Sequence, residues 1–382
     1  MSFVSGVSVL GMAALLTLAQ AAVALGQDPP PAAGDLRFTA ITAGGSHSCG
    51  LTSEGAAYCW GKNEFGQLGD SSHTDRSAPV RVAGGLAFRL LSAGAQHTCG
   101  ADTDGVPYCW GSNVQGQLGL GSTSDRNSPV RVATNIRVTG LSAGGEHTCA
   151  TIVHWERQDR MMCWGSNAHG QLGVRGEVRD AWSPILTFGT IKYAAIAAGS
   201  QHTCAASKQE LLFCWGSNGR GELGNGSRTP SPVPFLIRLS RRQTFVSVST
   251  GAAHSCALTS DGQVYCWGDN AAGQVGNGGG KSVIIPARLR DTLKFTALSA
   301  GGDATCGLRP DGSVSCWGSN AAGQFGGGAP TGSETPIAVL PRRVFTAISL
   351  GKEHACGLQA DGSAYCWGAG RPEPVRVVAQ PD

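Results

Sequence analysis

The spacing of the cysteines constrains this chain more than any other feature. Its fourteen cysteines form seven pairs, and the first members of successive pairs lie 50 to 55 residues apart. A period of that length is typical of a protein built by repeating one supersecondary unit. The pairs are Cys49 and Cys59, Cys99 and Cys109, Cys149 and Cys163, Cys204 and Cys214, Cys256 and Cys266, Cys306 and Cys316, and Cys356 and Cys366.

Each copy of the repeat alternates short β-rich runs with Gly, Asn and Asp, and none has a helical period. The first copy reads FTAITAGGSHSCGLTSEGAAYCWGKNEFGQLG. Seven such units predict an all-β fold, a seven-bladed β-propeller with four short antiparallel strands in each blade. The seven copies occupy residues 36–382. We also expect the two chain ends to share one blade, with residues 38–43 pairing with residues 374–378.

The string A-G-x-x-H-(S/T)-C-x-L-T-x-(D/E)-G, followed by Y-C-W-G-x-N-x-x-G-Q-L-G, resembles the repeat of the family named for the regulator of chromosome condensation. The resemblance extends over nearly all of the chain after residue 35. It implies the propeller fold. It implies little about activity, since one fold hosts many unrelated functions.

The register of each hairpin predicts how the cysteines pair. In the fifth copy, Ser260-Asp261-Gly262 suits a three-residue loop, which places Cys256 directly opposite Cys266. These positions fall at a non-hydrogen-bonded pair, where strands approach to about 4.5 Å between Cα atoms, close enough for a disulfide. The same count applies to every regular copy, so we predict one intra-hairpin disulfide per blade. Such bridges indicate an oxidising compartment.

A metal site is the alternative for the cysteines, because His47, Cys49 and Cys59 would share one face. It would require equivalent sites in the other copies, yet the sixth copy has Ala304 where the histidine should be. We therefore expect no metal and no cofactor. The six histidines of the His-x-Cys motif each face a glycine across their hairpin, as His47 faces Gly61, and are expected to be structural rather than catalytic.

Two further repeated features are predicted to be architectural. The tryptophan after each second cysteine, as in Trp60, points to the opposite blade face and is expected to pack on the next blade. The Gly-Gln-Leu-Gly strings could be mistaken for phosphate-binding loops. They lack the following helix and the Lys-Ser/Thr of such loops, so they are predicted to be turns.

The chain begins with residues that predict a secretory leader. Residues 1–26 carry no charged side chain, and an apolar run from about Val7 ends in small residues at Ala22-Val23-Ala24. This pattern predicts a cleaved signal peptide over residues 1–26. An uncleaved single-span anchor is the alternative. Residues 27–35 are Pro-rich and are expected to form a spacer before the propeller. Leader and disulfides together predict an extracytoplasmic protein, secreted or periplasmic, with no membrane contact after cleavage.

Candidate binding residues come from the loops that differ among copies, between Gly-Gln-Leu-Gly and Pro-Val. These loops are expected to project together from one rim of a rigid ring, an arrangement suited to recognising a macromolecule. The net charge of 29 − 26 = +3 is too small and dispersed for a nucleic-acid site. Candidate anchors are Arg76, Arg126, Arg175, Arg179 and Trp182, and a second contact is expected at Trp155 and Arg157 of the third-copy insertion.

Catalytic residues are not expected, because no nucleophile elbow, zinc-protease motif or asymmetric carboxylate pair is present in the sequence. The leading hypothesis is a monomeric, non-enzymatic propeller that binds a protein partner. The resemblance supports this hypothesis, because secreted bacterial propellers of this repeat type look like inhibitors of extracellular enzymes. Two alternatives remain: an extracytoplasmic enzyme acting on polysaccharide, and a regulator similar to the family's nuclear guanine-nucleotide exchange factor.

Overall fold

The computed structural model describes residues 35–153, 160–239, 243–289 and 292–378. The chain divides into two compact units, Met1–Asp35 and Leu36–Asp382. All strands described below belong to the second unit. The predicted leader and nearly all of the predicted spacer lie outside the described residues. Among the residues that are described, no helix is long and apolar enough to cross a membrane.

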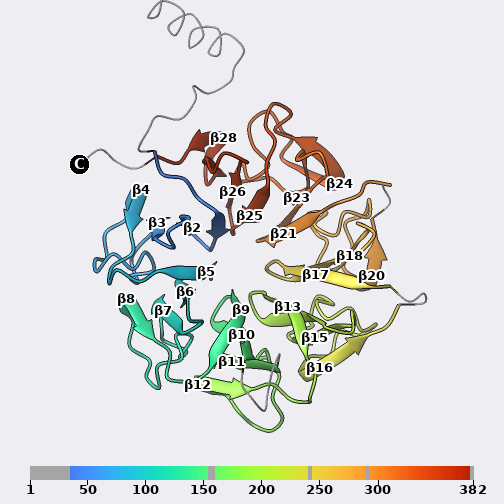
Figure 1. Ribbon diagram of the computed structural model, residues 1–382. Coiled ribbons are helices and arrows are strands. Elements are labelled where there is room, and N and C mark those ends of the chain that lie inside the picture. The colour runs from blue at the N-terminus through green and yellow to red at the C-terminus, as the bar shows by residue number, and fades with distance from the viewer. Residues whose placement is uncertain (1–34, 154–159, 240–242, 290–291, 379–382) are drawn as a thin grey trace, which may run out of the picture. The chain divides into compact units, whose positions relative to one another are not determined.

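The unit Leu36–Asp382 is a ring of seven four-stranded antiparallel sheets, which confirms the predicted propeller (Figure 1). Each sheet is made of four consecutive strands paired in chain order. We number the sheets as blades 1 to 7 along the chain. The first strand of each blade lies at the central channel, and the fourth strand lies at the outside.

The innermost strands lead into the Ala-Gly segments. They are β1 (Ala40–Ala43), β5 (Phe88–Ala93), β9 (Arg137–Ala143), β13 (Tyr193–Ala198), β17 (Phe245–Thr250), β21 (Ala297–Gly301) and β25 (Ala347–Leu350). The second strands carry the first cysteine of each pair. They are β2 (His47–Leu51), β6 (His97–Asp102), β10 (His147–Val153), β14 (His202–Ser207), β18 (His254–Thr259), β22 (Ala304–Leu308) and β26 (His354–Leu358).

The third strands carry the second cysteine and the tryptophan. They are β3 (Ala57–Gly61), β7 (Pro107–Gly111), β11 (Arg160–Ser166), β15 (Leu212–Gly216), β19 (Val264–Gly268), β23 (Val314–Ser319) and β27 (Ala364–Gly368). The outer strands follow the variable loops. They are β4 (Arg76–Arg81), β8 (Arg126–Arg131), β12 (Asp180–Leu186), β16 (Ser231–Ile237), β20 (Val283–Arg288), β24 (Gly332–Val339) and β28 (Arg371–Arg376).

The hairpin register is the one that the sequence predicts. Cys256 pairs with Cys266 and His254 with Gly268, while Gly262 has a φ of 80° in a loop closed by the Thr259 N–H to the Gln263 carbonyl. All seven predicted disulfides are present, with Cα–Cα distances of 4.0 to 4.1 Å. Every cysteine is therefore used as a bridge within its own blade.

The expectation that both chain ends share one blade is wrong. Strands β1 to β4 form blade 1 and strands β25 to β28 form blade 7, so each blade is complete by itself. The chain starts at the first strand of one repeat and ends at the fourth strand of another, which leaves no strand to exchange. The ring is closed instead by contacts between blades. They include the Phe38 N–H to the Gly362 carbonyl at 2.8 Å and an ion pair of Arg37 with Asp361 at 3.1 Å.

The core lies between the blades rather than in the middle of the ring. Trp110 of blade 2, for example, is fully buried among Leu68 and Val82 of blade 1 and Phe88 of its own blade. The tryptophans therefore do pack across blade boundaries, but against the preceding blade and not the next one. A tryptophan such as Trp110 packs against the preceding blade because the Gln-Leu turn of that blade reaches over the indole.

Candidate functional site

A histidine, a hydroxyl and a turn carbonyl form one hydrogen-bond network at five junctions between blades, which we call regular junctions. At three of them a tryptophan Nε1–H also donates to the turn carbonyl. At the junction of blades 1 and 2, the Gln67 carbonyl accepts the Thr98 hydroxyl at 2.8 Å and Trp110 Nε1–H at 3.0 Å. His47 Nε2 lies 2.8 Å from the same Thr98 hydroxyl. One backbone carbonyl of blade 1 thus holds two side chains of blade 2, and the histidine of blade 1 completes the network.

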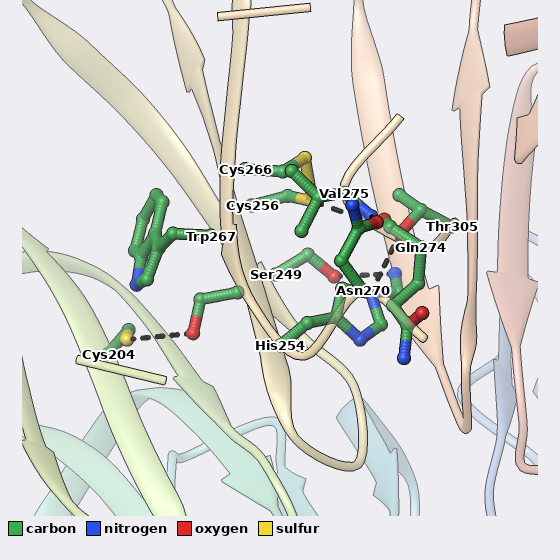
Figure 2. The surroundings of a disulfide bond; sticks show 12 residues. Cys204, Ser249, His254, Cys256, Cys266, Trp267, Asn270, Gln274, Val275 and Thr305 are labelled. Atoms are coloured by element: carbon green, nitrogen blue, oxygen red, sulfur yellow. Dashed lines mark hydrogen bonds between the residues drawn. A yellow bond between two sulfur atoms is a disulfide. The ribbon is translucent and has the colours of Figure 1, made fainter. Parts of the chain in front are cut away.

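The histidine–hydroxyl–carbonyl part of this network repeats around the ring, as Figure 2 shows for His254, Thr305 and Gln274. Trp164 and Trp317 Nε1 are buried without a hydrogen-bond partner among the described residues. In each case the histidine of one blade contacts a hydroxyl on the second strand of the following blade. The pairs are His47 with Thr98, His97 with Thr148, His147 with Thr203, His202 with Ser255, His254 with Thr305, and His354 with Ser48. The predicted structural role is thus carried out between blades rather than within one hairpin.

Burial keeps these histidines neutral. It lowers the pKa of His47, His97, His147 and His254 to about 3, with neighbouring histidines adding to the effect, and the pKa of His202 to about 4. The Thr98 hydroxyl has one hydrogen and donates it to Gln67, so His47 must donate from Nε2. Its Nδ1 then lies buried without a hydrogen-bond partner. A neutral imidazole that is fully enclosed cannot act on a substrate.

One junction lacks both members of the histidine–hydroxyl pair. In blade 6 the histidine position is Ala304, and in blade 7 the hydroxyl position is Ala355. Both alanines are fully buried. The two changes are complementary, because either one alone would leave a buried polar group without its partner. The sequence contains both alanines, but their pairing is visible only once the junction is assembled.

The turns explain the Asn-x-x-Gly-Gln-Leu-Gly string. Asn63 Oδ1 accepts the Leu68 N–H, and its amide donates to the carbonyls of Ser72 and Thr74. Gln67 Oε1 accepts the Phe65 N–H, which closes the turn. We call residues 63–69 and their equivalents the turn segment. The prediction that these strings are turns is confirmed, and their second role is to place the Gln67 carbonyl at the junction.

A channel of about 640 Å³ runs along the axis of the ring, lined by the Ala-Gly segments of all seven blades. A Cβ on Gly44 would come within 2.3 Å of the Gly94 carbonyl, so glycine is needed where the blades meet. Asp303 and Glu353 are carboxylates in this lining. Burial raises the pKa of Asp303, with repulsion from Asp269 adding to the effect. Groups of three or more metal-ligating side chains are absent from the described part of the chain.

The structure places the predicted rim anchors on consecutive blades but does not bring them into contact with one another. Arg76, at the start of β4, pairs with Asp70 of its own loop at 2.9 Å, and Arg126, at the start of β8, donates to the Asp125 carbonyl. Arg175 lies over the ring of Phe188, with 3.9 Å from Cζ to the ring centroid. Arg179 is exposed and directly precedes β12. Among the described residues, no hydrogen bond or ion pair joins two of these arginines.

Trp182 is the most exposed of the large aromatic anchors, with 52% of its surface accessible. It lies against Gly116 of the blade 2 turn segment, and its carbonyl accepts the Gly121 N–H at 2.7 Å. The same turn segment carries Val114, which is 60% exposed. Trp182 and Val114 are therefore two exposed apolar side chains on this part of the rim, one against the blade 2 turn segment and one carried by it. The second predicted contact, at Trp155 and Arg157, lies outside the described residues.

A groove of about 720 Å³, not predicted from the sequence, lies at the junction of blades 7 and 1, which we call the seam. Its lining includes Trp60, Ser48, Arg76, Arg371 and Cys366. Blade 7 has only Ala369-Gly370 between its third and fourth strands, so it supplies no turn segment to cover blade 1. The short seventh loop was the available signal. Only Arg76 among the predicted anchors lies in this lining.

Comparisons with known proteins identify the repeat. The model of the RCC1-like domain matches residues 138–373, more than half of the chain. The chain belongs to the RCC1 repeat family. Models of the regulator of chromosome condensation repeat also match residues 54–101 and 104–151, and a second such model matches residues 38–67 and 88–117.

Curated relatives are similar over only part of their length. The probable E3 ubiquitin-protein ligase HERC6 of Homo sapiens is 38% identical over 120 residues, which are 30% of this chain and 12% of that protein. The ultraviolet-B receptor UVR8 of Arabidopsis thaliana is 32% identical over 134 residues, 35% of this chain and 30% of that protein. The chain therefore spans a minor part of the first relatives that it matches.

Solved structures share the fold. Prp20p of Saccharomyces cerevisiae has a TM-score of 0.74 at 21% identity, covering 86% of this chain and 87% of that one. The ectodomain of the Arabidopsis thaliana receptor kinase ACR4 has a TM-score of 0.55 at 22% identity, covering 89% of this chain and 98% of that one. At these identities the likeness concerns the propeller alone.

Proposed function

We propose that this chain is a non-enzymatic binding propeller, acting outside the cytoplasm, that recognises a protein partner through its rim. The observation that carries the proposal is the contrast between an interior that repeats with few changes and one variable rim position. At this position each outer strand covers a turn segment of the preceding blade. It is occupied by Asn127, Trp182, Pro232, Ile284, Glu334 and Pro372 in blades 2 to 7.

A rigid frame with variable surface side chains suits recognition, since little conformational entropy is lost when the partner binds. Seven disulfides and the junction networks fix the backbone beneath the rim. Exposed Trp182 is the kind of anchor that dominates binding energy, and Arg126 and Arg179 supply charge at its margin.

The extracytoplasmic location rests on the disulfides, because seven bridges with no free cysteine require an oxidising compartment. The predicted leader agrees with this location. The solved neighbours are compatible with protein binding: one is yeast RCC1 bound to Kap60, another is Prp20p, described with its binding to Gsp1p and histones, and a third is a receptor-kinase ectodomain. A nuclear exchange-factor role would conflict with this compartment.

The test is partner capture by an immobilised, fully oxidised chain from the extracellular fluid of its source. The variant Arg126→Ala, Arg179→Ala, Trp182→Ala is expected to lose at least about tenfold in affinity for the captured protein. A matched control removes exposed apolar side chains at the hairpin rim, Val246→Ala with Val344→Ala, and should bind normally. Equal binding by all three proteins would refute the assignment of the rim.

The enzymatic alternative has one structural feature to examine. Asp303 in the channel has a raised pKa, as a general acid requires. Turnover of polysaccharides by the native chain, abolished by Asp303→Asn, would replace the binding proposal. We expect no turnover.

A further inference from the structure

We propose that the seam groove binds a turn from a partner protein, which fills the place left empty by the turn segment that blade 7 lacks. The inference starts from the six equivalent places in the same molecule. Each of the other six blades carries a turn segment, and at the junction of blades 1 and 2 its Leu68 packs in one buried cluster with the Cys49–Cys59 bridge and Trp110. The six turn segments therefore indicate which side chain and which backbone groups an occupant of the seam groove should carry.

The first group left uncovered at the seam is a disulfide. Thirteen of the fourteen cysteines are fully buried, and Cys366 is the exception. Cys366 lines the groove at the position where Leu68 would lie in the equivalent junction. An apolar side chain of leucine size would therefore bury both this sulfur and the face of Trp60, which is 8% exposed while Trp110 is fully buried.

The second group is a pair of hydrogen-bond donors. Trp110 Nε1–H and the Thr98 hydroxyl both donate to the Gln67 carbonyl. Their counterparts at the seam are Trp60 and Ser48. Ser48 Oγ lies 2.7 Å from His354 Nε2 and 3.4 Å from Cys356 Sγ, and among the described residues neither Ser48 nor Trp60 donates to a turn carbonyl. One backbone carbonyl, placed as that of Gln67 is, would satisfy both donors.

The third group is a backbone acceptor on the outer strand. The Asn127 carbonyl of blade 2 accepts the Ser71 N–H from the loop of blade 1. The equivalent residue of blade 1 is Ser77, which is exposed and lines the groove. An incoming loop can donate to its carbonyl in the same way. Three contacts of known geometry are thus available to one continuous stretch of backbone.

The charge of the groove indicates which charge the residues on either side of the partner's turn should carry. The lining has a charge balance of 4 − 2 = +2, from Lys62, Arg76, Arg371 and Arg376 against Asp75 and Glu353. The ion pair of Arg76 with Asp70 reduces this balance to 2 − 1 = +1. A turn flanked by acidic residues is favoured over a basic one. A second copy of this chain is a poor occupant, because its own six turn segments are already buried in their junctions. The volume of about 720 Å³ is in the usual range for binding sites.

The experiment follows the reduction of each disulfide in the full chain by mild reductant, alkylation and mass mapping. The probe is a cyclised peptide with the sequence of the blade 1 turn segment, Asn-Glu-Phe-Gly-Gln-Leu-Gly. Without peptide, Cys356–Cys366 should be reduced first. Peptide at about ten times its dissociation constant should slow that reduction about tenfold, while Cys99–Cys109 in the same molecules stays unaffected. A peptide with Asp in place of Leu is the matched control and should not protect.

A variant of the chain with the groove filled provides a second, independent test. Replacing Ala369-Gly370 with the loop of blade 6, residues 319–331, should fill the groove in cis, slow the reduction of Cys356–Cys366 and abolish the effect of the peptide. Three outcomes would overturn the proposal: peptide that does not protect, equal protection in the filled variant, or a bridge in the native chain that already resists reduction as the other six do. A resistant bridge in the native chain would mean that the chain itself or a second copy covers the groove. A reduction rate that depends on protein concentration would indicate the second copy. The outcome is independent of the rim residues Arg126 and Trp182.

Discussion

The junction of blades 1 and 2 and the seam use the same strands and nearly the same side chains, yet only the former is sealed. Both have a histidine facing a hydroxyl, a tryptophan on the third strand and a phenylalanine at the start of the blade. They differ in one turn segment. Its removal leaves Trp60, Cys366 and His354 more exposed than their counterparts Trp110, Cys59 and His47. Packing between blades therefore depends on a loop rather than on the strands.

The largest expected effect comes from the two tryptophans. Trp110→Ala should lower the free energy of unfolding by about 3–5 kcal/mol, because it removes a large buried aromatic side chain. The change also removes one of the donors to the Gln67 carbonyl. Trp60→Ala should cost about half as much. Urea unfolding of both variants with disulfides intact measures the difference. Equal losses would mean that the seam is packed as tightly as the regular junction.

Acid should act through the histidines, and more strongly at the junction of blades 2 and 3 than at the seam. Burial lowers the pKa of His97 to about 3 and that of His354 to about 4, below the ordinary value of 6.5. The unfolded chain binds more protons in this window, so the stabilisation is complete above pH 6.5 and is lost as the pH falls toward the folded pKa.

His97→Gln should therefore reduce the loss of unfolding free energy between pH 7 and about pH 4 by on the order of 3 kcal/mol, and His354→Gln by less. Melting temperatures recorded across this pH range check both. A larger effect from His354→Gln would contradict the ordering of the two junctions.

A smaller effect is expected from restoring the network that blades 6 and 7 lack. Ala304→His alone and Ala355→Thr alone should each destabilise, because each buries an unpartnered polar group or overpacks a filled site. Together they should recover about 1 kcal/mol relative to the sum of the single changes. A double-mutant cycle by urea unfolding measures this coupling, and a coupling of zero would mean that the alanines do not face each other as His47 and Thr98 do.

The repeat and its disulfides could be predicted because they depend on local register. Cys256 and Cys266 face each other once the loop at Gly262 is known, and the same applies to His254 and Gly268. The ring closure could not be predicted that way, because it depends on which strand of a blade comes first. The Pro-Val string of the last copy, Pro374-Val375, lies in the outer strand of blade 7 and was the available sign that this blade is complete.

The candidate site was harder to predict than the fold. Rim side chains such as Arg76 and Arg126 bind to their own loops, an outcome that loop sequence alone does not determine. The seam groove required a comparison between copies, since its signal is a deletion beside Ala369 rather than a motif. The partner hydroxyl of each histidine lies one repeat away, so inspection of a single hairpin could not identify it.

The paired alanines and the seam lie on the two sides of blade 7 and should make it the first blade to open. It is bounded on one side by a junction without the histidine–hydroxyl bond and on the other by a junction without a turn segment. A cooperative unit with fewer contacts to its neighbours opens at a lower free energy than the rest of the molecule. Amides of β26 and β27 should accordingly exchange with solvent before those of β6 and β7, so blade 7 is the point from which the ring comes apart.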